Sequence, residues 1–115
     1  MIIAVAYDNG LIAEHFDQTA YFKIYETEGP EVAGSVLVPT AAGPHVNITK
    51  VLVDCQVNML ICGEIGKGAM ASCSENGIVV FGGNRGKADD AVKQFLTGDL
   101  SYDPDPSSVR RGELS

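Results

Sequence analysis

The second half of the chain alternates apolar segments with helical patterns, and this order constrains the fold more than any other feature. Apolar runs at 57–62 and 78–81 are each followed by a glycine-rich turn, at 63–68 and 82–86, and then by a helix-forming segment. Strands that alternate with helices in this way are joined by right-handed crossovers and pair in parallel. The sequence therefore predicts an α/β domain with parallel strands at its centre.

The first 40 residues add three further strands. A β-branched run from Ile2 to Ala6 predicts a buried strand, followed by a polar loop at 8–18. The segments 21–26 and 31–38 flank a Gly-Pro turn and predict an antiparallel hairpin. The expected fold is a three-layer α/β/α domain around a mixed five-stranded sheet with one antiparallel strand. Its chain order is strand, strand, strand, helix, strand, helix, strand, helix.

Three helices are expected to cover this sheet. The first carries Ile48, Val51, Leu52 and Cys55 at helical spacing on one apolar face. Asn76-Gly77 is a typical helix end, and so is Gly98. The helices are predicted to begin near Pro44, after Gly68 and at Asp89, and the last to end at Leu96.

The length and net charge of the chain limit the number of domains and the kinds of partner it can bind. A chain of 115 residues fits one domain, predicted over 1–100, with a loose proline-containing tail at 101–115. The net charge of −7 disfavours a nucleic-acid partner, which would be held mainly by Lys and Arg. No apolar run is long enough to cross a membrane, and three cysteines without a secretory signal argue against a disulfide framework. We expect a cytoplasmic protein.

Residues capable of binding a ligand follow several of the predicted strands. In open α/β sheets, ligands bind beyond the carboxyl ends of the parallel strands. His15 lies in the loop after the first strand, His45 precedes the first helix, Cys62 ends a strand, and Arg85 lies in the second glycine-rich turn. Imidazole and thiolate suit iron, zinc and iron–sulfur species.

The glycine-rich turn at 63–68 adds a second kind of ligand chemistry. The backbone amides near Gly63 and Gly66, with the side chain of Lys67, favour an anion at a helix N-terminus. The turn is neither a Walker loop nor a dinucleotide fingerprint. An anionic metal–sulfur species and a phosphate-bearing ligand therefore both remain possible occupants, and tight packing of strand on helix explains the glycines equally well.

The ordered set of motifs resembles the dinitrogenase iron–molybdenum cofactor biosynthesis family, which includes NifX, the NafY core domain and the C-terminal part of NifB. The resemblance spans residues 2–100. It is carried by the motifs Ile3-Ala4-Val5-Ala6, Glu14-His15-Phe16, Tyr21-Phe22-Lys23-Ile24-Tyr25, Gly43-Pro44-His45, Leu60-Ile61-Cys62-Gly63-Glu64-Ile65-Gly66 and Asn76-Gly77-Ile78, and by the ending from Ala91 to Leu100.

This resemblance implies a ribonuclease-H-like fold and a non-enzymatic NifX-like protein that binds or carries an iron–molybdenum or related iron–sulfur cluster as transient cargo. It implies His15 as the metal ligand, and donor and acceptor proteins as further partners. Some similar proteins end in a tail rich in cysteine and histidine, whereas the segment 107–111 here contains neither. Metal capture through such a tail is therefore not expected.

Each candidate also has an ordinary structural explanation. His15 and His45 could be solvated loop residues, and Cys62 could be a small core hydrophobe. Cys55 and Cys73 fall on inward helical faces and are predicted to be core residues. Carboxylates near strand ends, Asp8, Glu64 and Asp89, also occur in ribonuclease-H-like nucleases, but the acidic chain disfavours that activity. A phosphate- or nucleotide-binding module and a protein-interaction module remain alternatives to the cluster carrier.

Overall fold

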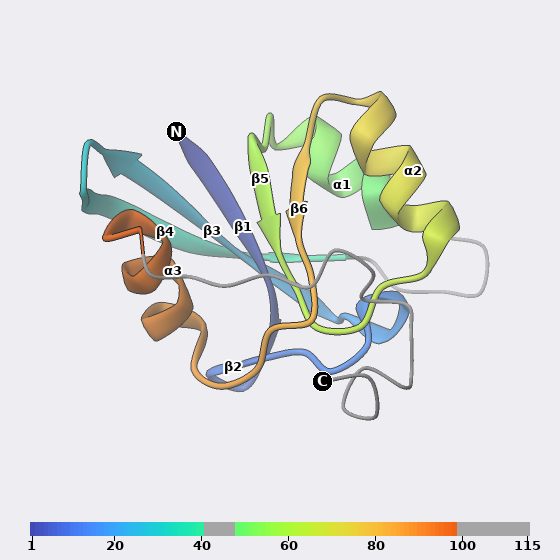
Figure 1. Cartoon of the computed structure of the whole chain (residues 1–115), viewed down its shortest axis with the longest axis horizontal. Coiled ribbons are helices and arrows are strands. Elements are labelled where there is room, and N and C mark those ends of the chain that lie inside the picture. The colour runs from blue at the N-terminus through green and yellow to red at the C-terminus, as the bar shows by residue number, and fades with distance from the viewer. Residues whose placement is uncertain (41–47, 99–115) are drawn as a thin grey trace.

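The computed structural model describes residues 1–40 and 48–98, and Figure 1 shows their arrangement. The strands form one sheet in the order β4-β3-β1-β5-β6, with the short β2 paired to β1. The strands are β1 (Ile2–Asp8), β2 (Leu11–Ile12), β3 (Tyr21–Glu28), β4 (Glu31–Pro39), β5 (Met59–Ile61) and β6 (Val79–Phe81). The helices are α1 (Ile48–Asp54), α2 (Lys67–Glu75) and α3 (Ala88–Leu96), with a 3-10 turn, η1, at Phe16–Gln18.

The directions of the strands confirm the predicted mixed sheet. β1 pairs in parallel with β5, and β5 with β6, whereas β3 is antiparallel to both β1 and β4. Of the five longer strands, β3 alone therefore runs against the others. The segment expected to be only a polar loop contains the short strand β2 and η1 as well, because Ile12 and Phe16 turn inward and are buried.

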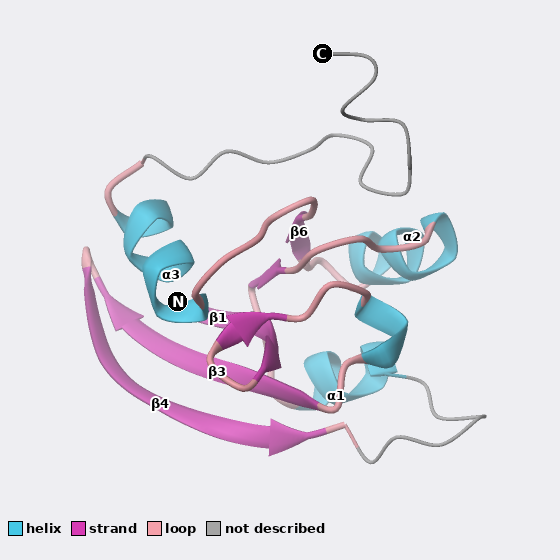
Figure 2. Cartoon of the chain, turned by 90° about the horizontal axis from the view of Figure 1, so that it is seen from below, coloured by secondary structure: helices cyan, strands magenta, loops and turns pink. Residues whose placement is uncertain are grey.

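Side chains alternate between the two faces of the sheet and give the molecule two cores. One core lies under α1 and α2 and joins Ala4, Phe22 and Leu60 of the sheet to Leu52 and Cys73 of the helices. The other lies under α3, where Ile3, Val5, Met59 and Ile61 meet Ala88, Ala91 and Val92. Figures 1 and 2 show α1 and α2 together and α3 apart from them. The predicted three-layer α/β/α class is confirmed, while the finer likeness to ribonuclease H stays a prediction.

Some predicted boundaries differ from the structure, and others lie outside the described residues. The second helix begins at Lys67, one residue before the end of the predicted 63–68 turn, because Gly66 already serves as the extended N-cap residue. The predicted helix start at Pro44 and the tail at 101–115 lie outside the described residues. Among the described residues, no helix has the length and apolar character needed to span a membrane.

Candidate functional site

The His15 loop is anchored beneath by a buried aromatic side chain. Phe16 is 3% exposed, and its ring centroid lies 5.9 Å from that of Phe22 on β3. His15 itself has extended backbone dihedrals, precedes the 3-10 turn and keeps 40% of its side chain exposed. The loop therefore presents an imidazole to solvent from a fixed backbone.

The turn after β5 is joined directly to this loop. Phe16 N donates to Glu64 O at 2.9 Å, and Glu64 N donates to Glu14 O at 2.8 Å, so that His15 and Glu64 form a parallel bridge. A Cβ atom on Gly63 would lie 2.6 Å from Glu14 O and 2.7 Å from Ala13 O. Only glycine allows the two backbones to approach this closely.

The turn after β6 is part of the same backbone network. Gly83 N donates to Gly63 O at 2.9 Å, Asn84 N donates to Cys62 O at 3.0 Å, and Ile12 N donates to Gly86 O at 2.8 Å. The loops that follow β1, β5 and β6 are thus hydrogen-bonded to one another at one edge of the sheet. This convergence is the one expected from the strand order.

A pocket of about 250 Å³ opens beside His15 at this edge. It lies where β1 ends and the His15 loop begins. Its walls combine one aromatic ring, two carboxylates, one amide and one imidazole with two small apolar side chains, and the lining residues are Tyr7, Asp8, Ala13, Glu14, His15, Gln18 and Ala20. A small polar ligand or one face of a larger one fits a hollow of this composition and size.

Both imidazole nitrogens face carboxylates. His15 Nδ1 lies 3.8 Å from Glu64 Oε2, and His15 Nε2 lies 4.0 Å from Glu14 Oε1. Both distances exceed a hydrogen bond, and the Glu14 and Glu64 side chains are 83% and 46% exposed. Neither carboxylate therefore makes a hydrogen bond to the His15 ring.

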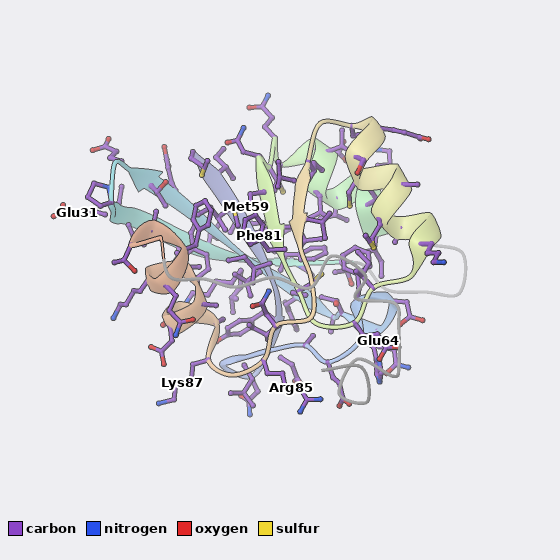
Figure 3. The ribbon with its side chains drawn as sticks, viewed as in Figure 1. Glu31, Met59, Glu64, Phe81, Arg85 and Lys87 are labelled. Carbon is purple, nitrogen blue, oxygen red and sulfur yellow. The ribbon has the colours of Figure 1, made fainter. Side chains whose placement is uncertain are left out.

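The basic residues predicted for the site lie around this edge. Lys67 is the first residue of α2 and follows the N-cap residue Gly66, which makes no side-chain capping bond. Arg85 is exposed in the turn after β6, and Figure 3 shows Glu64, Arg85 and Lys87 along the same edge of the molecule. This edge of the molecule therefore carries cationic side chains as well as carboxylates.

Cys62 lies beneath the edge, without access to solvent. It is 0% exposed, and desolvation together with the nearby Cys73 raises the pKa of its thiol to about 12. Burial also raises the pKa of the Cys73 thiol, and Cys55 is half-buried. The core positions predicted for Cys55 and Cys73 agree with their packing in the core under α1 and α2. Cys62 as a ligand stays a prediction that its burial does not support.

The described residues do not form a complete metal site. Among residues 1–40 and 48–98, no three His, Cys, Asp or Glu side chains are arranged to hold a metal ion. His45 falls within 41–47, outside the described residues. The sequence did not reveal Glu64 as the neighbour of His15, because no local pattern encodes a contact between two separate loops. It also did not reveal that Tyr7, Glu14 and Gln18 line one pocket with His15.

Comparison with known proteins places the chain in a family. The family model described as dinitrogenase iron-molybdenum cofactor matches residues 1–98. No curated protein matches the sequence significantly. Among solved structures, PH0822 shares 25% identity and superposes with a TM-score of 0.84, covering 91% of this chain and 96% of its own.

Two further structures show the same fold. MJ0327 of Methanocaldococcus jannaschii, whose description links it to dinitrogenase, has 24% identity and a TM-score of 0.77, with 92% of this chain and 97% of its own covered. The apo form of the orange protein from Desulfovibrio gigas has 23% identity and a TM-score of 0.79, with 93% and 96% covered. Because the family model matches residues 1–98 of the 115, the chain belongs to the dinitrogenase iron-molybdenum cofactor family.

Proposed function

We propose that this protein binds and carries an iron–molybdenum or related iron–sulfur cluster, without catalysing a reaction, and that His15 is its principal ligand. The observation that carries the proposal is the position of His15. Its half-exposed imidazole stands at the rim of a 250 Å³ pocket, on a loop hydrogen-bonded to the turn after β5. Family membership supplies the class of cargo.

A small number of ligands suits a carrier, because the cargo must leave as well as arrive. A single imidazole is a borderline-soft donor that binds iron species without enclosing them. The uncapped N-terminus of α2 contributes amide groups and a positive helix dipole toward an anionic cluster. Lys67, Arg85 and Lys87 add positive charge, and Glu14 and Glu64 turn outward when the cargo is bound.

A cluster carrier also needs partner proteins. A cluster that is only transiently held passes from a donor protein to an acceptor protein, and we propose both as partners in the cytoplasm. The fully buried Cys62 then acts as a core residue, and His45 and Gly63 to Lys67 remain candidates for secondary contacts.

Anaerobic reconstitution tests this function. The protein is incubated with ferrous iron and sulfide, with and without molybdate, desalted, and examined by absorption spectroscopy and metal analysis. The native protein is expected to retain a coloured cluster, and His15→Ala is expected to lose most of it. Gln18→Ala is the matched control, because Gln18 lines the same pocket without a metal-binding nitrogen.

The outcomes separate the competing functions. A native protein that retains no cluster would exclude the carrier function, and unchanged uptake by His15→Ala would remove only the ligand assignment. A thermal-shift series with inorganic phosphate and nucleotides covers the alternative ligand class, because a ligand that binds the folded state raises the Tm. A rise with phosphate alone would favour phosphate binding at the amides of the glycine-rich edge.

A further inference from the structure

Within residues 1–40 and 48–98, the edge strand β4 pairs only with β3, and no described helix or strand covers its outer side. Eight of its nine residues are exposed, including Val36 at 58% and Leu37 at 48%. Figure 2 shows β4 along the outer rim of the sheet. The opposite edge strand, β6, has only three residues, and a short edge strand resists pairing with other chains. β4 is therefore the long unprotected edge of this sheet.

The hydrogen-bonding direction along β4 follows from one bond at its end. Thr40 N donates to Ala20 O at 3.0 Å, so the Thr40 backbone faces β3. In an antiparallel pair the direction alternates with each residue, so Val38 and Val36 also face β3. The backbone groups of Ser35, Leu37 and Pro39 then face away from the sheet. No other strand of the described part of the chain pairs with these groups, and Pro39 supplies only its carbonyl oxygen.

The same stretch is regular and uncharged. The register irregularity between β3 and β4 is confined to the hairpin end, at Glu26/Thr27, and pairing is regular from Gly34 to Pro39. The segment Ser35-Val36-Leu37-Val38-Pro39 carries no charge, although the chain as a whole has a net charge of −7. Soluble proteins commonly protect long edges with charged side chains, and this segment has none.

We propose that β4 is an interface between two copies of this chain, which pair antiparallel about a two-fold axis at Leu37. In this register each Leu37 N donates to the Leu37 carbonyl of the other copy, and each Ser35 N donates to the Pro39 carbonyl of the other copy. Val36 lies opposite Val38, and Leu37 opposite Leu37. Pro39 lies opposite Ser35, so its missing N–H costs one bond in each half of the interface.

A second copy is the occupant favoured by this uncharged segment, which is self-complementary about Leu37. Two molecules that each carry −7 repel one another, and β4 between Ser35 and Pro39 lets them meet without opposing like charges. The register is also self-complementary, since every apolar side chain of this segment from Val36 to Val38 meets another apolar side chain. A single strand pair is smaller than the roughly 1,600 Å² interface of a stable complex, so the dimer dissociates on dilution.

Sedimentation velocity over a wide concentration series of the full chain tests the proposal. The native protein is expected to shift from monomer to dimer as its concentration rises. Leu37→Lys places two lysines together at the axis and is expected to weaken association about tenfold or more. Ser35→Pro removes an outward N–H and is expected to weaken it as well. Val79→Lys, at a 57% exposed position on β6, is the matched control and leaves association unchanged.

Variants with opposite charges at position 37 test whether the two copies of Leu37 meet at the two-fold axis. Leu37→Lys and Leu37→Glu are each expected to be monomeric, and an equimolar mixture of the two is expected to recover the dimer. Circular dichroism confirms that each variant is folded. A native protein that stays monomeric at every concentration would overturn the proposal, as would a dimer that persists in both Leu37 variants. Preferential pairing of β4 with an unrelated extended peptide would assign the edge to a different partner.

Discussion

The hydroxyl of Tyr25 donates a hydrogen bond of 2.5 Å to Oδ1 of Asp89, and this bond connects the sheet to α3. Lys23 Nζ donates to the same oxygen at 2.9 Å. The ammonium group of Lys23 also lies 5.2 Å from the ring centroid of Tyr25 and 5.7 Å from that of Tyr7. Two side chains of β3 thus bond to the first turn of α3, and the Tyr7 ring of β1 contacts one of them, Lys23.

Replacing Asp89 with Asn is expected to destabilise the fold by about 1–2 kcal/mol. The substitution removes a charge-assisted hydrogen bond to Lys23 and weakens the bond from Tyr25, but Asp89 is 60% exposed and solvent screens part of the loss. Urea denaturation measures the change. Asp90→Asn is the matched control, because Asp90 occupies the same first turn of α3 and lies outside this cluster.

The difference in stability between the native protein and Asp89→Asn is expected to depend on pH, because Asp89 is titratable. Hydrogen bonds from Lys23, and then from Tyr25, lower the pKa of Asp89 in the folded protein. The stabilisation is therefore present above the unfolded pKa, near 4, and is lost as the pH falls through the lower folded value. Native protein and Asp89→Asn should differ at pH 6 and converge in strongly acidic solution. A difference that persists there would contradict the assignment.

The protein is expected to lose stability at alkaline pH because of Tyr25. Burial, followed by the hydrogen bond to Asp89, raises the pKa of its phenol well above the ordinary value of 10.0. The neutral phenol is thus favoured by folding, and this contribution is lost as the pH rises from the unfolded pKa toward the folded one. Tyr25→Phe is expected to be less stable at pH 7 and to lose less stability than the native protein above pH 10. Thermal unfolding at a series of pH values measures both effects.

The order of the elements could be predicted because apolar periodicity and glycine positions are local signals. The apolar runs at 57–62 and 78–81 and the helical face of Leu52 are visible within a few residues of sequence. The pocket could be predicted only as far as His15. Its relation to Glu64 depends on two loops from different strands lying side by side, and no local pattern encodes that contact.

Gly63 has a steric role that is independent of its predicted role in ligand binding. The sequence favours the glycine-rich turn as a source of amide groups for an anion. The structure adds a steric reason, because the backbone oxygens of Ala13 and Glu14 occupy the space that a Cβ atom would need. Glycine is required here for the joining of two loops, whatever ligand the edge binds.

Gly63→Ala is therefore expected to destabilise the protein by about 2 kcal/mol or more, since the new methyl group meets rigid backbone atoms. Gly68→Ala makes the matched control. Gly68 lies within α2, with open space where a Cβ atom would stand, so alanine there is expected to stabilise the fold by about 0.5–1 kcal/mol. If the two glycines have these different roles, urea denaturation will show a lower free energy of unfolding for Gly63→Ala and a higher one for Gly68→Ala than for the native protein.

NMR spectra of the backbone amides show which residues the Gly63→Ala substitution disturbs. Shifts in the NMR resonances of Glu14, His15 and Phe16 are expected, because the backbones of Glu14 and Phe16, on either side of His15, are hydrogen-bonded to the displaced turn. Gly68→Ala should change resonances only near α2. Equal stability of Gly63→Ala and native protein would show that the two loops separate without cost and that the His15 position is not fixed by this contact.

The three cysteines are expected to react with a thiol reagent at very different rates. The thiolate is the reactive form, and with a pKa of about 12 the thiolate fraction of Cys62 at pH 7.5 is on the order of 10⁻⁵. Cys73 is equally buried, with a raised pKa, whereas Cys55 is half-buried. Timed labelling with an aromatic disulfide at pH 7.5 should modify Cys55 first and the other two only after addition of denaturant. Cys55→Ser should abolish the early phase, whereas rapid labelling of Cys62 in the folded protein would show that the carboxyl end of β5 opens to solvent and would restore this thiol as a candidate ligand.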